Sequence, residues 1–298
     1  MAGRVAPAGG GGARGAQQRR AVNAPAVPSG IAPDVPADVL AWWQAAQRPC
    51  VLSGAGMSAE SGVPTFRDTP QSLWARFNPE TLATAEAFER DPPLVWAWYQ
   101  WRAHLVRQAQ PNAGHMALAR WARHRSGLRI VTQNVDDLHE RAGSPDVIHV
   151  HGSLFAPRCF TRGRPPGEPV APRAQDWQPE LRITPPACPH CAGPLRPGVV
   201  WFGEALPQGP WQAALDAVAT CDLLLVVGTS GLVHPAASLP AQALARGVPV
   251  VEINPQPTPL SGQVSRVLRM TAAVGLGGLV GADNLGHDFD LPKSDQRN

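Results

Sequence analysis

A glycine-rich loop follows an apolar segment near the start of the chain. Residues 50–53, Cys-Val-Leu-Ser, predict a buried strand and lead into Gly54-Ala55-Gly56-Met-Ser58-Ala59. The two glycines allow a tight turn and a close approach of the backbone to a pyrophosphate, and the small Ala59 allows helix–strand packing. The pattern also fits an ordinary glycine turn. No clear acidic ribose partner follows about 20 residues later, so the usual dehydrogenase pattern is excluded.

Polar residues also stand where other predicted strands end. Gln133, Asn134 and Asp136 follow one strand, and His151 follows the next. Amide and carboxylate groups can form hydrogen bonds to a polar ligand. A neutral imidazole, with an ordinary pKa of about 6.5, can take a proton from a hydroxyl. Asn134 and Asp136 could equally cap the next helix, and His151, like His149, could serve only the fold.

Three of the five cysteines lie in a segment rich in Pro, Arg and Gly. Cys188-Pro-His190-Cys191 has the spacing of a metal-binding pair, whereas Cys159 is followed three residues later by Arg162. A structural zinc site needs four ligands in a tetrahedral arrangement, and His190 is poorly placed to be the fourth. The sequence therefore predicts an incomplete zinc site. The alternatives are a segment held by packing alone, or free thiols of which two could oxidise.

Short apolar strands alternate with helices along most of the chain. Strands are expected at 50–53, 129–132, 147–150, 222–227 and 248–253, and helices at 38–47, 91–110, 112–124, 136–141 and 235–246. This alternation predicts a doubly wound parallel α/β sheet covered on both faces. We expect a Rossmann-like domain of residues 34–152 and 198–290, interrupted at 153–197 by a small cysteine-containing module with little apolar core. Residues 1–33 and 291–298 are expected to be tails, the first of them disordered.

The composition excludes several classes of protein. The chain has 298 residues, 44% of them hydrophobic, so it can form a large core. No apolar run approaches the roughly 18 residues of a membrane helix. Residues 1–33 carry four arginines and no acid, leaving 22 basic and 23 acidic residues elsewhere, so no nucleic-acid-binding surface is expected. An odd number of cysteines without a signal peptide predicts a reducing, cytoplasmic setting with no membrane contact.

Five segments, taken in order, resemble the signatures of the sirtuins, the NAD-dependent protein-lysine deacylases. They are residues 54–67, 132–136, 149–152, 228–230 and 253–254, and residues 199–204, Val-Val-Trp-Phe-Gly-Glu, resemble the substrate-binding strand of that family. The resemblance covers residues 49–281. It implies a Rossmann-like domain with a zinc-ribbon-like module, NAD as cofactor and acyl-lysine proteins as partners. Its products would be nicotinamide and O-acyl-ADP-ribose.

The resemblance also assigns roles to individual residues. It implies His151 as the general base, Asn134 as a second catalytic residue and Asp136 as the group that holds the carboxamide. The residues implied to bind NAD are Gly54, Ala55, Gly56, Ser58, Phe66, Arg67, Gln133, Asn134, Asp136, Gly228, Thr229, Ser230, Asn254, Gln256 and Ala272. A peptide would lie between 199–202 and 231–234, with contacts from Val200, Phe202, Gly203 and Glu204.

Two residues of the helix at 91–110 suit an acidic acyl group. Tyr99 and Arg102 are three residues apart on one helix face, where a phenol and a guanidinium can bind one carboxylate. An amphipathic helix with a solvated arginine would give the same pattern. The pair resembles that of class III sirtuins, which remove succinyl and malonyl groups, and Ala83 matches the residue that makes room for the longer chain. We expect removal of succinyl, malonyl and acetyl groups. Protein mono-ADP-ribosylation and a non-catalytic NAD or ADP-ribose sensor are the alternatives.

Overall fold

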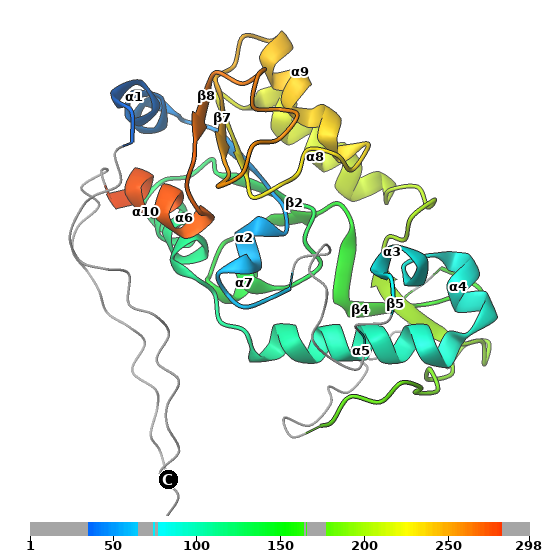
Figure 1. The fold of residues 1–298 in the computed structure, drawn as a ribbon. Helices are drawn as coiled ribbons and strands as arrows, with labels where there is room; N and C mark the ends of the chain where they lie inside the picture. Colours follow the sequence, from blue (N-terminus) through cyan, green and yellow to red (C-terminus); the bar gives the residue numbers. More distant parts are fainter. Residues whose placement is uncertain (1–34, 65–73, 75–76, 164, 166–176, 282–298) are drawn as a thin grey trace, which may run out of the picture. The chain divides into compact units, whose positions relative to one another are not determined.

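A parallel sheet forms the centre of the computed structural model, which describes residues 35–64, 74, 77–163, 165 and 177–281. Among these residues, six strands pair in the order β3-β2-β1-β6-β7-β8 (Figure 1). They are β1 (Pro49–Ser53), β2 (Arg129–Thr132), β3 (Val147–His149), β6 (Leu223–Val227), β7 (Val250–Ile253) and β8 (Arg266–Leu268). From the central pair β1 and β6 the chain winds outward in opposite directions. The predicted doubly wound sheet is confirmed, and β8 adds a strand that the sequence did not predict.

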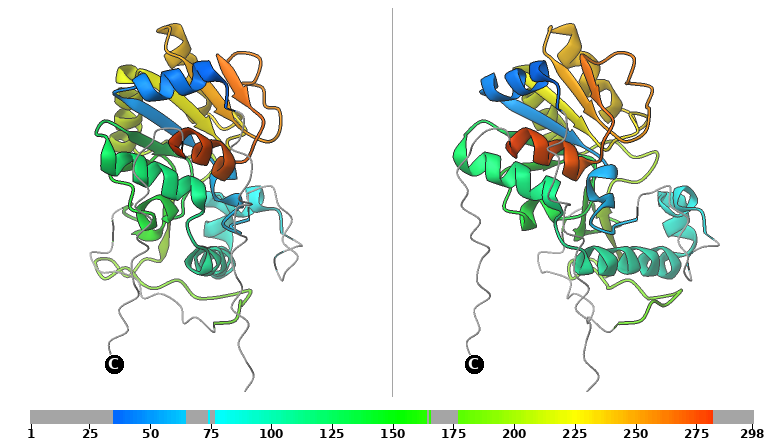
Figure 2. Two further views of the ribbon diagram at one scale, coloured as in Figure 1. Left: turned by 90° about the vertical axis from the view of Figure 1, so that its left-hand side faces the viewer. Right: turned by 60° about the vertical axis from the view of Figure 1, so that its left-hand side comes forward.

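Helices cover both faces of this sheet (Figures 1 and 2). One face carries α1 (Ala37–Ala45), α2 (Gly56–Ala59), α6 (Ala113–His124) and α10 (Ala272–Gly281). The other carries α8 (Gln208–Thr220), η1 (Ala236–Ser238) and α9 (Leu239–Ala245). In β6, Leu223, Leu225 and Val227 pack into the first layer, whereas Leu224 and Val226 pack into the second. The strand is apolar throughout because both of its faces are buried.

Capping residues set the helix boundaries. Asp91 caps α5 (Pro92–Gln108) by accepting a hydrogen bond from the N–H of Leu94, and Asn112 caps α6. The helix expected at 235–246 is divided into η1 and α9, because Pro240 has no N–H to donate to the carbonyl of Ala236. No helix in the described part of the chain has the length and hydropathy to cross a bilayer.

A smaller lobe surrounds a two-stranded antiparallel sheet. It contains β4 (Gly152–Cys159), β5 (Leu195–Val199), α3 (Pro79–Leu82), α4 (Ala85–Arg90) and α5. The ring of Phe88 in α4 lies 5.0 Å from that of Phe160 and 5.4 Å from that of Trp201. The segment 153–197 therefore shares a large apolar cluster with α3–α5, contrary to the expectation of little apolar core. Residues 79–108, grouped with the large domain in the sequence analysis, pack in this lobe.

Two buried histidines lie where α6 meets the sheet. The rings of His115 and His139 are 4.8 Å apart and inclined at 62°. His115 Nδ1 accepts the N–H of Asn112 at 3.3 Å, and His139 Nε2 lies 3.0 Å from the hydroxyl of Ser53. His115 Nε2 and His139 Nδ1 are buried without a hydrogen-bond partner among the described residues. Burial lowers the pKa of His115 to about 4 and that of His139 to about 3, so both rings are neutral in the folded chain.

Stability should therefore depend on pH. Below pH 6.5 these two histidines become protonated in the unfolded chain but stay neutral in the folded chain. The free energy of unfolding therefore falls toward pH 4, by about 1.4 kcal/mol per pH unit for each histidine. His115→Gln removes one of these groups while Gln retains an acceptor for the Asn112 N–H. We expect the slope between pH 6 and 4.5, measured by urea unfolding, to become shallower by about that amount. His124→Gln, at the exposed end of α6, is the control. An unaltered slope in His115→Gln would contradict the assignment.

Candidate active site

Two glycine turns meet at the centre of the sheet, where the winding direction reverses. The N–H of Gly56, after β1, donates to the carbonyl of Gly228, after β6, at 2.7 Å. A Cβ on Gly56 would lie 2.7 Å from Cα of Gly228, and Gly228 has φ +59°. The two backbones can approach this closely only without side chains. In an open α/β sheet this position, at the carboxyl ends of the strands, is where ligands bind.

Gln133 connects three strand ends at this point. Its N–H donates to the carbonyl of Ser53 in β1 at 2.9 Å, and its side-chain amide donates to the hydroxyl of Thr229 at 2.9 Å. The amide of Asn254 donates to the carbonyl of Thr229 at 2.9 Å, and the Asn254 side chain accepts the N–H of Gln256. A cavity of about 210 Å³ borders the Gln133–Thr229 bond. The polar residues after β1, β2, β6 and β7 are thus brought to one edge of the sheet.

A buried polar cluster lies between α2 and the loop before α7 (Leu138–Arg141). The Asn134 amide donates to Ser58 Oγ at 3.0 Å, and Ser58 Oγ donates to Asp136 Oδ2 at 2.9 Å. Asp136 Oδ1 accepts the N–H of Leu138 at 3.2 Å, so this carboxylate also holds the loop at the start of α7. Burial raises the pKa of Asp136 above its ordinary value. The carboxylate and the amide can therefore orient a polar ligand group while they also hold the loop.

His149 and His151 differ in how many of their ring nitrogen atoms have a hydrogen-bond partner among the described residues. His149 Nδ1 lies 3.1 Å from the carbonyl of Asn134, and its Nε2 lies 2.5 Å from Glu140 Oε1. Burial alone would lower the pKa of His149, but Glu140 raises it above its ordinary value. His151 uses only Nδ1, 3.0 Å from the carbonyl of Gln133, and no partner for its Nε2 lies among the described residues.

This arrangement makes His151 suited to accept a proton. A carbonyl can only accept, so Nδ1 carries the hydrogen and Nε2 keeps its lone pair. Burial lowers the pKa of His151, and the bond to Gln133 opposes only part of that shift. His151 lies in the turn where the chain passes from β3 to β4. Gly152 follows with φ +76°, and a Cβ there would lie 2.1 Å from the carbonyl oxygen of Gly198.

The residues expected to bind substrate lie in the smaller lobe. The N–H of Val200 donates to the carbonyl of His151 at 2.8 Å, and that of Phe202 donates to the carbonyl of Ala83 at 2.9 Å. Phe202 and Gly203 are exposed, whereas Ala83 is buried. The segment 200–203 is thereby fixed beside the histidine.

The carboxylate of Glu204 has its ion-pair and hydrogen-bond partners within the smaller lobe. It pairs with Arg196, lies 3.1 Å from Arg158 Nη2, and accepts the N–H of Trp201 at 2.9 Å. Burial alone would raise the pKa of Glu204, but Arg196 and the N–H of Trp201 hold it below its ordinary value. The structure therefore gives this side chain a role in holding the 200–204 turn, and any substrate contact at 204 would use the backbone.

The expected acyl-binding pair is brought together on α5. Tyr99 is buried and Arg102 is half-buried. The two groups interact electrostatically, so each affects the pKa of the other. Burial raises the pKa of Tyr99 to about 12. Ala272 is buried at the start of α10, and Ser230 and Ala55 border the two glycine turns. Phe66 and Arg67 lie outside the described residues.

Sequence reasoning missed the buried groups beneath this site. Ser53 Oγ donates to Thr132 Oγ1 at 2.8 Å, and Thr132 Oγ1 accepts the N–H of Asn134 at 3.1 Å. His139 completes this group from α7. The available signal was a polar residue, Ser53 or Thr132, that ends each strand directly after an apolar run.

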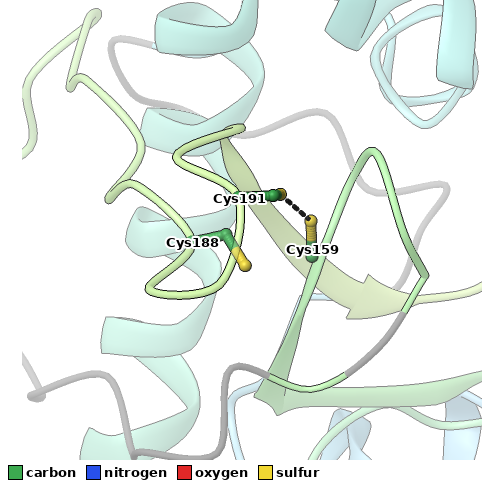
Figure 3. A group of neighbouring side chains, drawn as sticks. All are labelled: Cys159, Cys188 and Cys191. Carbon is green, nitrogen blue, oxygen red and sulfur yellow. Dashed lines mark hydrogen bonds between the residues drawn. The ribbon is translucent and has the colours of Figure 1, made fainter.

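The three clustered cysteines lie close together in the smaller lobe (Figure 3). Their sulfur atoms are within 4.8 Å of one another, and Cys159 Sγ is 3.5 Å from Cys191 Sγ. Burial alone would raise the pKa of Cys159, but the N–H of Arg162 and the neighbouring thiols lower it. Three converging sulfur atoms can hold a zinc ion. The described residues supply no fourth ligand, because Arg162 occupies the position from which one would come.

A doubly wound sheet with glycine turns at its switch point, and with a polar cluster and an available imidazole at the carboxyl ends of its strands, defines a nucleotide-binding α/β protein. Residues 54–235 match the model of the Sir2 family. The chain belongs to the Sir2 family, the sirtuins.

Relatives and solved structures agree with this assignment. The chain is 54% identical over 212 residues to NAD-dependent protein deacylase 1 of Pseudomonas aeruginosa, covering 71% of this chain and 84% of that protein. It is 51% identical over 233 residues to the NAD-dependent protein deacylase of Mycobacterium tuberculosis, covering 78% and 96%. The crystal structure of a Sir2 homolog–NAD complex has a TM-score of 0.74 and 42% identity, covering 84% of this chain and 94% of that one.

The incomplete cysteine set leads to a prediction on metal affinity. Arg162→Cys supplies a fourth thiolate, so we expect it to bind zinc at least about tenfold more tightly than the wild type. Elemental analysis after dialysis against chelators of graded strength measures this. Arg162→Ser removes the arginine without adding sulfur and is the matched control. Equal zinc retention by the Cys and Ser variants would show that position 162 does not reach the metal.

Proposed function

We propose that this chain is an NAD-dependent protein-lysine deacylase of the class III type. It removes succinyl and malonyl groups from lysine, and acetyl groups as well, with nicotinamide and O-acyl-ADP-ribose as products. The names of the two relatives support the general reaction. The observation that carries the proposal is the imidazole of His151, whose Nε2 has no partner among the described residues and whose Nδ1 is bound to Gln133, in the loop that also carries Asn134 and Asp136 of the polar cluster with Ser58.

The donor set at this site fits NAD. When bound, NAD supplies the ribose carbon that receives the acyl oxygen as nicotinamide leaves. Asp136 and Asn134 orient the carboxamide and the ribose from the buried side, and the glycine turns leave backbone room for the pyrophosphate. His151 Nε2 takes a proton from a ribose hydroxyl, because Nδ1 is committed to the carbonyl of Gln133.

The acyl-lysine peptide adds as a strand in this proposal. It lies between 199–202 and 231–234, where main-chain hydrogen bonds give affinity with little side-chain specificity. Phe202, Leu232 and Val233 support this placement, since they are large apolar side chains with exposed fractions of 47%, 53% and 38%. The acyl group reaches toward Tyr99 and Arg102.

The first test is the product. Incubation with NAD and matched succinyl-, malonyl- and acetyl-lysine peptides, followed by mass spectrometry, should give O-acyl-ADP-ribose and free lysine. ADP-ribosylated protein would instead indicate mono-ADP-ribosyl transfer. Ligand binding without nicotinamide release would indicate a sensor, and either result would overturn the proposal.

His151→Ala removes the general base. We expect it to fold, with deacylation falling roughly a hundred- to ten-thousandfold, as is usual for loss of a positioned acid–base group. Thermal unfolding and NAD binding, measured on the same preparation, verify that the variant is intact. Wild-type turnover by an intact variant would remove His151 from the mechanism.

Arg102→Met removes the cation from the acyl-binding pair and leaves a side chain of similar length. The kcat/KM ratio of succinyl- to acetyl-lysine peptide should fall by about ten- to a hundredfold, the value of a charge-assisted hydrogen bond. Arg107→Met, one turn further along α5, is the matched control and should leave the ratio as it is. Equal losses on both peptides in Arg102→Met would exclude a carboxylate-binding role.

A further inference from the structure

The hydroxyl of Tyr99 has one hydrogen-bond partner in the described part of the chain. Trp201 Nε1 lies 3.1 Å from the phenolic oxygen, between side chains that are 2% and 3% exposed. An indole N–H can only donate, so the Tyr99 oxygen must accept this bond. The phenolic hydrogen is therefore directed away from Trp201 and has no acceptor among the described residues.

An unmatched donor of this kind selects for a ligand group that accepts hydrogen bonds. A carboxylate offers only acceptors, and Arg102 adds a positive charge from the same face of α5. The methyl end of an acetyl group offers no acceptor. Tyr99 is protonated at neutral pH, and burial moves its pKa further from neutrality, to about 12.

The indole that directs Tyr99 is itself fixed by the smaller lobe. The guanidinium carbon of Arg196 lies 3.3 Å from the centre of the Trp201 ring, and Arg196 pairs with Glu204. Glu204 also accepts the N–H of Trp201, and the Phe88 ring packs 5.4 Å away. The Trp201 ring cannot turn away from Tyr99 without breaking these contacts.

We propose that Trp201 is a positioning residue for acyl selectivity. Its indole N–H donates to the Tyr99 oxygen, so that the Tyr99 hydroxyl hydrogen is directed at the carboxylate of an acidic acyl group. This inference rests on the proposed function, in which Tyr99 and Arg102 receive that carboxylate. It separates the role of Trp201 from that of its neighbours Val200 and Phe202, which were expected to contact the peptide.

Trp201→Phe removes the N–H and keeps an aromatic ring beneath Arg196. We expect the kcat/KM ratio of succinyl- to acetyl-lysine peptide to fall about three- to tenfold, mainly through KM for the succinyl peptide, as for the loss of one neutral hydrogen bond. Because Trp201 acts through Tyr99, the same substitution in a Tyr99→Phe background should change the ratio by less than about twofold. A structural role would persist in both backgrounds.

A second variant covers the case in which Trp201→Phe fails to fold. Incorporation of 3-benzothienylalanine at 201 keeps the shape of the indole and replaces only its N–H with sulfur, and it should lower the ratio equally. Equal losses on both peptides, no loss of selectivity, or an undiminished effect in the Tyr99→Phe background would each overturn the inference. Arg102→Met tests the underlying site separately. An equal loss of kcat/KM on the succinyl and acetyl peptides in that variant would exclude the carboxylate site itself.

Discussion

The hydrogen bonds of Gln133 are the constraint on which the rest of the site depends. Its N–H holds the end of β1, its side chain holds Thr229 after β6, and its carbonyl orients His151. Three segments distant in sequence are thus fixed by one residue, through its N–H, its carbonyl and its side-chain amide N–H. Buried backbone groups are costly to leave unpaired, so the 133–136 loop cannot move without cost. The position and tautomer of the imidazole are consequences of this loop.

The charges of the two lobes are connected across the site. Asp136 belongs to the buried cluster beside β2, and Arg102 belongs to α5 in the smaller lobe, yet the charge of Asp136 acts on the guanidinium of Arg102 and opposes the lowering of its pKa by burial. A second carboxylate brought into this region would be repelled by Asp136 if nothing compensated it. Arg102 supplies that compensation, and Tyr99 adds a donor without adding charge. Under the proposed function, binding of an acidic acyl group would therefore require the smaller lobe to be in place.

The strands, the glycine turns and the polar strand ends could be predicted because they are local patterns. Gly54 and Gly56 follow an apolar run directly, and Tyr99 and Arg102 are brought together by one helix. The bond between Trp201 and Tyr99 joins residues 102 positions apart, and nothing in either segment specifies the other. The same holds for the packing of Phe88 on Phe160. These contacts depend on how α3–α5 cover β4 and β5, which periodicity does not encode.

The geometry of the smaller lobe explains why an incomplete cysteine set is compatible with an intact site. His151 and Gly152 stand at the beginning of β4, and Cys159 stands at its end, roughly 23 Å further along an extended strand. Between them the sheet is held by the aromatic cluster of Phe88, Phe160 and Trp201, and Cys159 is itself part of that apolar cluster. A metal would therefore add to a lobe that already has its own core. Tyr99, in the proposed acyl-binding pair, draws its support from that core. Gln133, which orients the imidazole, draws its support from Ser53 and Thr229 of the large domain, so neither residue depends on the cysteines.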